Sequence, residues 1–550
     1  MKKPLLYPDV CTRPSTSGDL RTASPVVSDP EAINCVPALI AALAICGVLG
    51  GISLLVPPFI HWDSAHGFLA WRGTLLGAAN SRIEVDPANI AHDYPYFLTF
   101  LSPGQYLVPG VISLLGVPLG IAITLTVTLS LLVCLTGWVM VVRAFAPRTN
   151  LALLVAVLIG SFHYSTHAFT TYHGGEILLQ AATPWLVLTA YRVPEMDIGP
   201  AALLVVGAVF FAFFAKLTGL IVVAAALVAG SMVSLAFGRR ITHGMIGGAL
   251  GAVSALAIVY VTFLSRGSTA VSETNWSLPF NSIAFASLAP WVAGMSWEDP
   301  ISLTYFFITN SYLTATVYLA AVVLPALLVA GLVLFWRPQT TNEKKFRLFC
   351  LWFCGVVAAV FTLLFVHGAL ILLEERHLRS AGTLLFVCAL MSALAAGTPG
   401  WTRGLFLALC VLMAVYGLGS FSYHELTTAK RQFLDRTSWT NQRIFDAAAI
   451  DFTREVYARE GRDALFVLPS YQLAVTFPVD ARIIVIDLDY EPESKIAGHY
   501  SGRVPGHVYV LMPNIIFDTD KGRALLSAFR DYAPSAWERK RFAEISVFFQ

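Results

Sequence analysis

A series of long apolar runs constrains the fold of this chain more than any other feature. An α-helix needs about 20 mostly apolar residues to cross the hydrocarbon core of a bilayer. Such runs lie at residues 36–58, 119–142, 150–166, 176–191, 199–215, 217–237, 244–264, 312–336, 348–372, 380–397 and 404–422. Composition agrees, because 56% of the residues are hydrophobic and only 13% are charged, against about 25% charged in soluble chains. We therefore predict a polytopic α-helical membrane protein with about eleven transmembrane helices.

The basic residues between these runs predict an orientation. Cytoplasmic segments of membrane proteins carry an excess of Lys and Arg. If the N-terminus is cytoplasmic, most basic residues of the membrane part fall on the cytoplasmic side, and the outer side holds only Arg72, Arg82, Lys216, Arg266, Arg376 and Arg379. An odd number of spans then places the C-terminus outside. The formal net charge of +2 gives no indication of nucleic-acid binding.

The chain divides into three parts by composition. Residues 1–33 are rich in Pro, Ser and Thr and predict a disordered cytoplasmic tail, not a secretory signal peptide. Residues 34–422 form the predicted transmembrane domain, with large outer loops at 59–118 and 265–311. In residues 423–550, "ALFVLP", "RIIVIDLD", "HVYVLMP" and "KRFAEISVFF" are typical of strands, with helices between them. We expect this last part to be a soluble extracytoplasmic α/β domain with a recognition or structural role.

The stretch "PPFIHWDSAHGFLAWRG" at residues 57–73 follows the first apolar run directly. Read as a helix from Trp62, it places Phe68, Trp71 and Leu75 on one face, and Asp63 and His66 on the other. This pattern predicts a helix lying on the membrane with its aromatic residues toward lipid. Its polar face would present Asp63 and His66 to a cavity at the membrane surface. Alternatively, Asp63 is a solvated carboxylate and Trp62 an interfacial anchor.

Two further clusters of polar residues lie in predicted outer segments. "HDYPYF" at residues 92–97 offers His92, Asp93 and Tyr94, although an Asp before Tyr-Pro is also an ordinary turn residue. "FHYSTHAFTTYHGGE" at residues 162–176 holds His163, His167, His173 and Glu176. Imidazoles at this spacing are weak candidates for binding zinc or a similar cation. The other interpretations are hydrogen bonding to a sugar or phosphate, or no role, so the cofactor stays unknown apart from this candidate divalent metal.

Four segments resemble one family. An Asp just outside the first helix followed by "GFLAWRG" is similar to the GT-C superfamily of integral membrane glycosyltransferases. "SPGQYLVPG" at 102–110, "FFAKLTGL" at 213–220 and "LLEERHLRSAGTLL" at 372–385 look like its re-entry segment, lysine turn and outer Glu-Arg segment. The proline often found in the last segment is replaced here by residues 380–382. The resemblance covers residues 36–422 and is architectural, because each motif is degenerate.

The resemblance implies a function. Such enzymes transfer a sugar from a polyprenyl-phosphate carrier to a glycan, lipid or protein acceptor. The transfer takes place on the outer face of the cell membrane, in bacteria the inner membrane, and contributes to the cell envelope. The first-loop aspartate usually acts as general base, a role that maps onto Asp63, with Asp93 as the alternative or second carboxylate.

The chemistry itself requires a carboxylate that accepts the acceptor proton and cations that hold the departing phosphate. Candidate phosphate ligands are Arg376, Arg379 and Lys216, although Lys216 and Arg376 could equally extend toward lipid headgroups. Candidate substrate contacts are His66, Arg72, His92, Tyr94, His173 and Glu176.

Two other classes of function remain open from the sequence. One is a transporter or flippase of lipid-linked saccharide. Transporters commonly contain internal repeats and ionisable groups near the bilayer midplane. This chain shows no clear repeat, and its ionisable residues gather at the outer rim, which favours chemistry at the surface. The other is a catalytically inactive relative that serves as a membrane scaffold.

Overall fold

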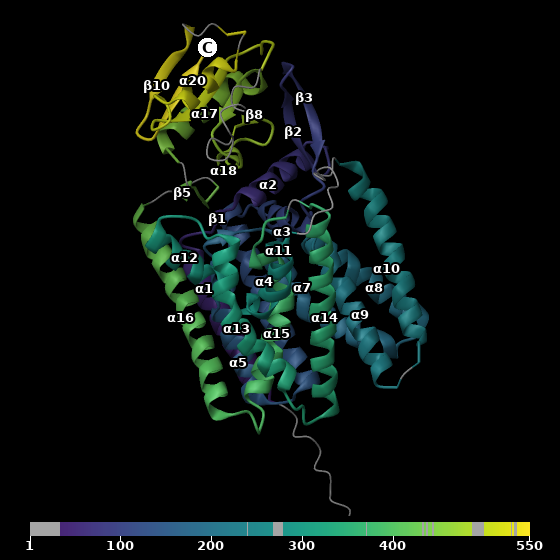
Figure 1. The fold of residues 1–550 in the computed structure, drawn as a ribbon. Helices are drawn as coiled ribbons and strands as arrows, with labels where there is room; N and C mark the ends of the chain where they lie inside the picture. Colours follow the sequence, from purple (N-terminus) through teal and green to yellow (C-terminus); the bar gives the residue numbers. More distant parts are fainter. Residues whose placement is uncertain are drawn as a thin grey trace, which may run out of the picture.

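The computed structural model describes residues 34–238, 240–267, 279–369, 371–431, 434–435, 438–442, 445–486, 500–529, 531–532 and 536–550. The predicted tail at 1–33 lies outside these residues. The helical part forms a bundle, and the C-terminal sheet stands at one end of it (Figure 1).

The helices of the bundle follow the apolar runs of the sequence closely. They are α1 (Val36–Ser53), α3 (Gly104–Ser113), α4 (Leu119–Phe145), α5 (Thr149–Ser161), α6 (His163–His167), α7 (Gly175–Arg192), α8 (Ile198–Ala215), α9 (Gly219–Ala236), α10 (His243–Thr262), α11 (Phe280–Leu288), α12 (Glu298–Thr309), α13 (Ala315–Phe335), α14 (Thr341–Val366), α15 (Arg379–Ala393) and α16 (Gly400–Arg431). Helix α2 (Trp62–Leu75) lies between this bundle and the C-terminal sheet (Figure 1).

Each predicted span contains a helix, but not all of these helices have the length or apolarity of a span. Within the described residues, eight helices are long and apolar enough to cross a membrane: α1, α4, α8, α9, α10, α13, α14 and α16. The protein is therefore a multi-pass membrane protein, while the predicted number of about eleven spans is not confirmed. Helices α5 and α15 have only 13 and 15 residues. Almost every residue of α15 is buried by other helices, so its apolar character reflects protein packing more than contact with lipid.

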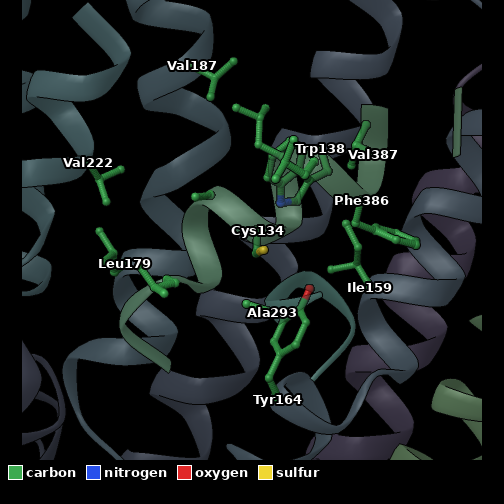
Figure 2. Close-up of a cluster of buried hydrophobic side chains, with 14 of the residues drawn as sticks. Cys134, Trp138, Ile159, Tyr164, Leu179, Val187, Val222, Ala293, Phe386 and Val387 are labelled. Atoms are coloured by element: carbon green, nitrogen blue, oxygen red, sulfur yellow. The ribbon is translucent and has the colours of Figure 1, made fainter. Parts of the chain in front are cut away.

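The core of the bundle is built around α4. Cys134 and Trp138 of α4 meet Ile159 of α5, Val187 of α7 and Phe386 of α15 in one buried cluster (Figure 2). Trp138 is the largest of the fully buried side chains. This packing fixes the relative positions of α7 and α15, whose ends at the C-terminal-sheet side carry the polar residues of the site.

The C-terminal part contains a mixed five-stranded sheet. Its strands are β7 (Leu465–Leu468), β8 (Arg482–Val485), β9 (Val508–Pro513), β10 (Glu538–Arg541) and β11 (Ile545–Phe549), in the order β10-β11-β9-β7-β8. Strands β8, β7 and β9 are parallel, and β11 and β10 are antiparallel additions. The helices here are α17 (Ala447–Glu460), α18 (Tyr471–Ala474) and α20 (Asp520–Ser527). Strands β7, β8, β9 and β11 coincide with the four segments in which the sequence predicts strands.

A small second sheet joins the two parts of the chain. It consists of β1 (Phe59–Ile60), β4 (Thr171–Tyr172), β5 (Leu434–Asp435) and β6 (Thr440–Asn441), in the order β4-β1-β6-β5. Strand β1 follows the first membrane helix, β4 precedes α7, and β5 and β6 follow α16. Because β1 pairs in parallel with both β4 and β6, this sheet anchors the beginning of the C-terminal part beside the first outer loop.

The first outer loop contains a hairpin that the sequence does not predict. Strands β2 (Ser81–Asp86) and β3 (Asn89–Phe97) pair antiparallel and extend toward the C-terminal sheet (Figure 1). Val85 and Ile90 of the hairpin are buried in one cluster with Leu465 and Val508 of that sheet. The hairpin therefore completes part of the core of the C-terminal domain.

Helix α2 corrects the expectation of aromatic residues facing lipid. Phe68 is fully buried and belongs to the core of the bundle. Trp71 packs so closely against α3 that a Cβ added at Gly110 would lie 2.6 Å from its ring. The aromatic face of α2 is covered by protein, because the C-terminal part and α3 occupy both of its sides.

Candidate functional site

A cavity of about 580 Å³ lies at the end of the bundle nearest the C-terminal sheet. Four parts of the chain line it: the β1–α2 junction, the segment from α6 to the first turns of α7, the start of α12, and the segment that connects α14 to α15. Its charged and histidine side chains are His61, Asp63, His167, His173, Glu176, Glu298, Asp299, Glu374, Arg376 and Arg379. The cavity thus gathers ionisable groups that lie more than 300 residues apart in the sequence.

Asp63 lies in the first turn of α2, where its charge is favourable to the helix dipole. His61 caps this helix, because its ring Nδ1 accepts a hydrogen bond from the Asp63 backbone N–H at 3.3 Å. The Asp63 Oδ2 lies 3.4 Å from Nη1 of Arg376 and 3.7 Å from Nδ1 of His61. Its other oxygen, Oδ1, has no hydrogen-bond partner among the described residues, and the side chain is 31% exposed. One oxygen is held in place and the other is open to the cavity.

Arg376 connects the acidic groups of the cavity. It lies in the 3-10 turn η5 (Glu375–His377) just before α15. Its guanidinium forms ion pairs with Glu374, with Asp63, and with Glu176 at 3.6 Å. Burial opposes the charged form, but the three carboxylates together raise the pKa of Arg376. Arg376 therefore stays charged and is largely neutralised by its neighbours.

Lys216 does not line the cavity but joins the same network of ion pairs through Glu176. Its Nζ lies 2.7 Å from Oε1 of Glu176, in the first turn of α7. This contact depends on close approach of the α8 end to the α7 start, where a Cβ added at Gly175 would lie 2.5 Å from the Ala215 carbonyl oxygen. Glu176 is thus shared between Lys216 and Arg376.

Arg379 differs from these two cations. It lines the cavity at the first position of α15, and its guanidinium lies 5.2 Å from the centre of the Tyr164 ring. Its buried Nε has no hydrogen-bond partner within the described part of the chain, which also gives it no ion pair within 4.0 Å. Of the three candidate phosphate ligands, Arg379 therefore has the most unused hydrogen-bonding capacity.

The histidines form a second group of side chains at the cavity. Because β1 and β4 run parallel in register, His61 and His173 follow paired residues and stack with ring centroids 4.2 Å apart. The Nε2 atoms of His167 and His173 are 3.2 Å apart, and His163 Nδ1 lies 2.8 Å from Asp299 Oδ2. Burial lowers the pKa of His61 and lowers that of His173 further, so both rings are neutral at physiological pH. Within the described residues, no group of three His, Cys, Asp or Glu side chains is placed to hold a metal ion.

Glu298 and Glu375 form a close acidic pair beside the cavity. The Glu298 Oε2 accepts a hydrogen bond from the Glu375 backbone N–H at 2.6 Å, and Tyr318 donates to Glu375 Oε1 at 2.5 Å. Burial raises the pKa of both carboxyl groups. The negative charge of Glu298 further raises the pKa of Glu375, and the charges of Asp299 and Glu374 further raise the pKa of Glu298. The pair therefore retains a proton at pH values where a solvated glutamate has lost it.

This pair predicts a pH dependence of stability. A carboxyl whose pKa is raised in the folded protein binds more protons folded than unfolded, so its contribution is complete below the ordinary pKa near 4.3 and declines as pH rises. Above the ordinary histidine pKa of about 6.5, where the buried neutral histidines no longer change stability, we expect thermal unfolding of the purified protein to occur at lower temperature as pH increases from 7 toward 9. The decline is at most about 1.4 kcal/mol per pH unit for one group. Glu375→Gln, which stays neutral, should flatten this dependence, and an unchanged slope in that variant would contradict the assignment.

Several predicted site residues lie outside the cavity. Arg72 is buried and donates to the backbone carbonyls of Ala474 at 2.8 Å and Pro478 at 2.5 Å, so it fastens α2 to the C-terminal part. His66 is buried between Arg82, whose Nη1 lies 2.5 Å from its Nδ1, and the Tyr471 ring. Burial, together with Arg82, lowers the pKa of His66 to about 3. Both side chains are occupied by contacts within the protein.

The second predicted cluster lies on the hairpin. His92 and Tyr94 are exposed on β3, and the Tyr94 hydroxyl donates to Glu84. Asp93 accepts from Arg482 Nε and Nη2 at 2.9 and 2.8 Å and from Arg462 at 3.0 Å. Asp93 therefore forms an ion pair with the C-terminal sheet. Of the two predicted aspartates, Asp63 lines the cavity and Asp93 does not.

Removing the Asp93 carboxylate should destabilise the protein without altering its chemistry. Arg482 is 6% exposed and Asp93 17%, so Asp93→Ala leaves a buried guanidinium without its partner, at a cost of about 3 kcal/mol. We expect a lower unfolding temperature of the C-terminal part in thermal scans, with any activity per folded molecule unchanged. Glu84→Gln on the neighbouring strand is the matched control, because the hydrogen-bond partners of Glu84 among the described residues, Arg82 and Tyr94, belong to the first outer loop.

Sequence reasoning did not single out His61, Glu374 or Glu375 as site residues. His61 lies two positions before Asp63, and Glu374 two before Arg376. Closeness in sequence to a predicted site residue could therefore have identified both. Glu298 and Asp299 appear in the sequence only as carboxylates of the second outer loop.

The bundle of apolar helices, the C-terminal sheet and the cavity between four chain segments define a multi-pass membrane protein, and its overall fold is similar to that of a solved structure. Among solved structures, the chain is similar to ArnT from Cupriavidus metallidurans in the apo state, with a TM-score of 0.50, 12% identity, and coverage of 93% of this chain and 97% of that one. The structure of the same ArnT bound to undecaprenyl phosphate gives a TM-score of 0.48 at 12% identity, with the same coverage of both chains. The mycobacterial arabinofuranosyltransferase AftD gives 0.46 at 13% identity, over 92% of this chain and 39% of that one. No protein-family model matches the chain, and no curated protein matches it by sequence.

Proposed function

We propose that this protein is a glycosyltransferase that moves a sugar from a polyprenyl-phosphate carrier to an acceptor hydroxyl at the extracytoplasmic face of the cell membrane. The observation that carries the proposal is the pairing of Asp63 with Arg376 in one cavity, which Arg379 also lines. A carboxylate and cations side by side are what transfer from a phosphate leaving group requires. The fold supports the same class of chemistry.

Asp63 is the proposed general base. Its Oδ2 is held by Arg376 and His61, so Oδ1 is directed to the acceptor. As the acceptor oxygen forms its bond to the anomeric carbon of the sugar, its proton passes to Asp63. The bond between the anomeric carbon and the phosphate oxygen breaks at the same time, and the carrier leaves as polyprenyl phosphate with both electrons of that bond.

Arg379 is the proposed primary ligand of the donor phosphate. Lys216 and Arg376 are already paired with Glu176, Glu374 and Asp63. An anion that approached them would compete with these carboxylates. Arg379 has unused donors at the cavity wall and sits at the N-terminal end of α15, where the helix dipole also favours an anion. Arg376 then adds positive charge and orients the base.

The neutral histidines are proposed to contact the sugar. Rings such as those of His61 and His173 offer both a donor and an acceptor, which suits hydroxyl groups. Glu298, which also lines the cavity, can accept or donate a hydrogen bond according to its protonation state.

The experiment that tests this function is a transfer assay with purified full-length protein in detergent. The protein is incubated with a panel of radiolabelled polyprenyl-phosphate sugars and an extract of envelope acceptors, and products are separated from donor. Transfer from one donor, absent in Asp63→Asn, supports the proposal. Donor binding without transfer, combined with movement of labelled donor across proteoliposome membranes, would instead identify a flippase. Binding with neither transfer nor movement would favour an inactive scaffold.

A further inference from the structure

The C-terminal part contacts the transfer site through one short helix, α18. This helix packs against α2, the helix whose first turn carries Asp63 (Figure 1). Both ends of α18 are engaged. The Tyr471 ring contacts the beginning of α2, and the Ala474 carbonyl accepts a hydrogen bond from Arg72 in the last turn of α2. The two helices therefore form one packed unit between the bundle and the C-terminal sheet.

Three aromatic rings meet where these two helices begin. The Tyr471 ring lies on the His66 ring, with centroids 3.8 Å apart and an angle of 36° between the planes. The Trp62 ring stands edge-on to both, at 4.6 Å from His66 and 6.1 Å from Tyr471. Aromatic pairs in such arrangements attract beyond the effect of their buried area. The cluster joins residue 471 to the residue before Asp63 and to the residue one helical turn after it.

The His66 ring is also held by the first outer loop. Its Nδ1 lies 2.5 Å from Nη1 of Arg82, whose guanidinium is 5.7 Å from the centre of the Tyr471 ring. The His66 side chain is buried and does not line the cavity. His66 therefore acts on the site by packing and not by contact with a substrate.

The Asp63 carboxylate depends on the position of the helix that carries it. Within the described residues it is held by two long contacts, 3.4 Å to Nη1 of Arg376 and 3.7 Å to Nδ1 of His61. Long contacts restrain a side chain weakly, so the backbone of the first turn of α2 decides where the carboxylate stands. A displacement of about 1 Å lowers the rate of a reaction by about 10²-fold.

We propose that Tyr471 is a positioning residue of the transfer site. Its ring holds Trp62 and His66, which fixes the first turn of α2 and with it the distance from Asp63 to the acceptor hydroxyl. This inference rests on the proposed transfer function and deepens it, because it makes the C-terminal part a working component of the site. Through α18, a movement of the C-terminal part changes the rate of transfer without changing the affinity for the donor.

Steady-state transfer by the full-length protein tests this role. We expect Tyr471→Ala to lower kcat about tenfold and to change the donor KM by less than about twofold, because the phosphate ligands stay in place. Tyr471→Phe keeps the ring and should restore most of the rate. Tyr500→Ala is the matched control, because Tyr500 is likewise half-buried and stacks on another ring, that of Phe529 in the C-terminal part.

A double variant tests whether Tyr471 acts through His66. If it does, His66→Ala lowers kcat to a similar extent, and adding Tyr471→Ala has little further effect, since residues that act as one unit are not additive. Four results would each overturn the proposal: additive losses in the double variant, an unchanged kcat in Tyr471→Ala, a loss confined to the donor KM, or an equal loss of kcat in Tyr500→Ala.

Hydrogen exchange separates failure of this inference from failure of the proposed function. Absence of transfer by the wild-type protein would contradict the proposed function, but it would leave the contact of Tyr471 with α2 intact. In either case, mass spectrometry should show the backbone amides of residues 62–70 exchanging about tenfold faster in Tyr471→Ala than in wild type or Tyr500→Ala, because the start of α2 opens more readily. Unchanged exchange in Tyr471→Ala overturns the positioning role, whether or not the protein transfers a sugar.

Discussion

Replacing Asp63 by asparagine should reduce sugar transfer by about 10²- to 10⁴-fold, the range usual for loss of a general base. Asparagine keeps the size of the side chain and can still donate or accept a hydrogen bond beside Arg376 and His61. It cannot take a proton from the acceptor, so the chemical step fails while the donor still binds. The measurement is the initial rate of transfer together with the donor dissociation constant for the same preparation.

A matched control separates this loss from a general effect of removing an acid. Asp451 on α17 is 69% exposed, and within the part of the chain that the structure describes its ion pair is with Arg454, one turn away. Asp451→Asn should leave both rate and donor affinity unchanged. If Asp63→Asn keeps more than a tenth of the wild-type rate, Asp63 is not the base, and Glu176 or Glu374 becomes the next carboxylate to test.

The membrane fold was predictable because hydropathy acts locally along the chain. A run such as 119–142 must form a helix in lipid whatever surrounds it, and α4 matches it closely. Helix α15 shows the limit of this reasoning. Its residues are as apolar as those of a span, but they are buried by neighbouring helices, and composition alone cannot distinguish a lipid environment from a protein one.

Parts of the site were predictable because single residues stand out in apolar surroundings. Asp63, Arg376 and Arg379 each border an apolar run at the outer side. An ionisable side chain at such a position is a candidate functional residue. Their pairing was not predictable, since 313 residues separate Asp63 from Arg376. The same holds for His61 and His173, which are brought together by parallel strands of only two residues each.

The residues placed elsewhere share one physical cause. Arg72 and Asp93 are both engaged by the C-terminal part, through backbone carbonyls and through Arg482 respectively. A periodicity argument for a helix or loop treats its polar face as open to solvent or substrate. The packing of residues 465–485 on that face is a tertiary contact, and the local pattern carries no sign of it.

Replacing Arg379 by glutamine should weaken binding of the donor more than any other single change among the three candidate cations. Loss of charge-assisted hydrogen bonds to a phosphate should raise the donor dissociation constant about 10- to 100-fold. Polyprenyl phosphate without a sugar should lose affinity by a similar factor, because the lost contact is to the phosphate. Titration of both ligands against wild type and variant, followed by tryptophan fluorescence, measures the change.

Three variants make this result specific. Arg462→Gln removes an arginine that is 55% exposed on the C-terminal part and should not change donor affinity. Arg379→Lys keeps the charge but not the planar fork, so an intermediate loss is expected. Lys216→Met should act differently, because the buried Glu176 carboxylate then loses its Lys216 partner and keeps only its ion pair with Arg376. We therefore expect this variant mainly to lower stability. If Lys216→Met weakens donor binding and Arg379→Gln does not, the phosphate lies behind Glu176 and the carboxylate network must rearrange when the donor enters.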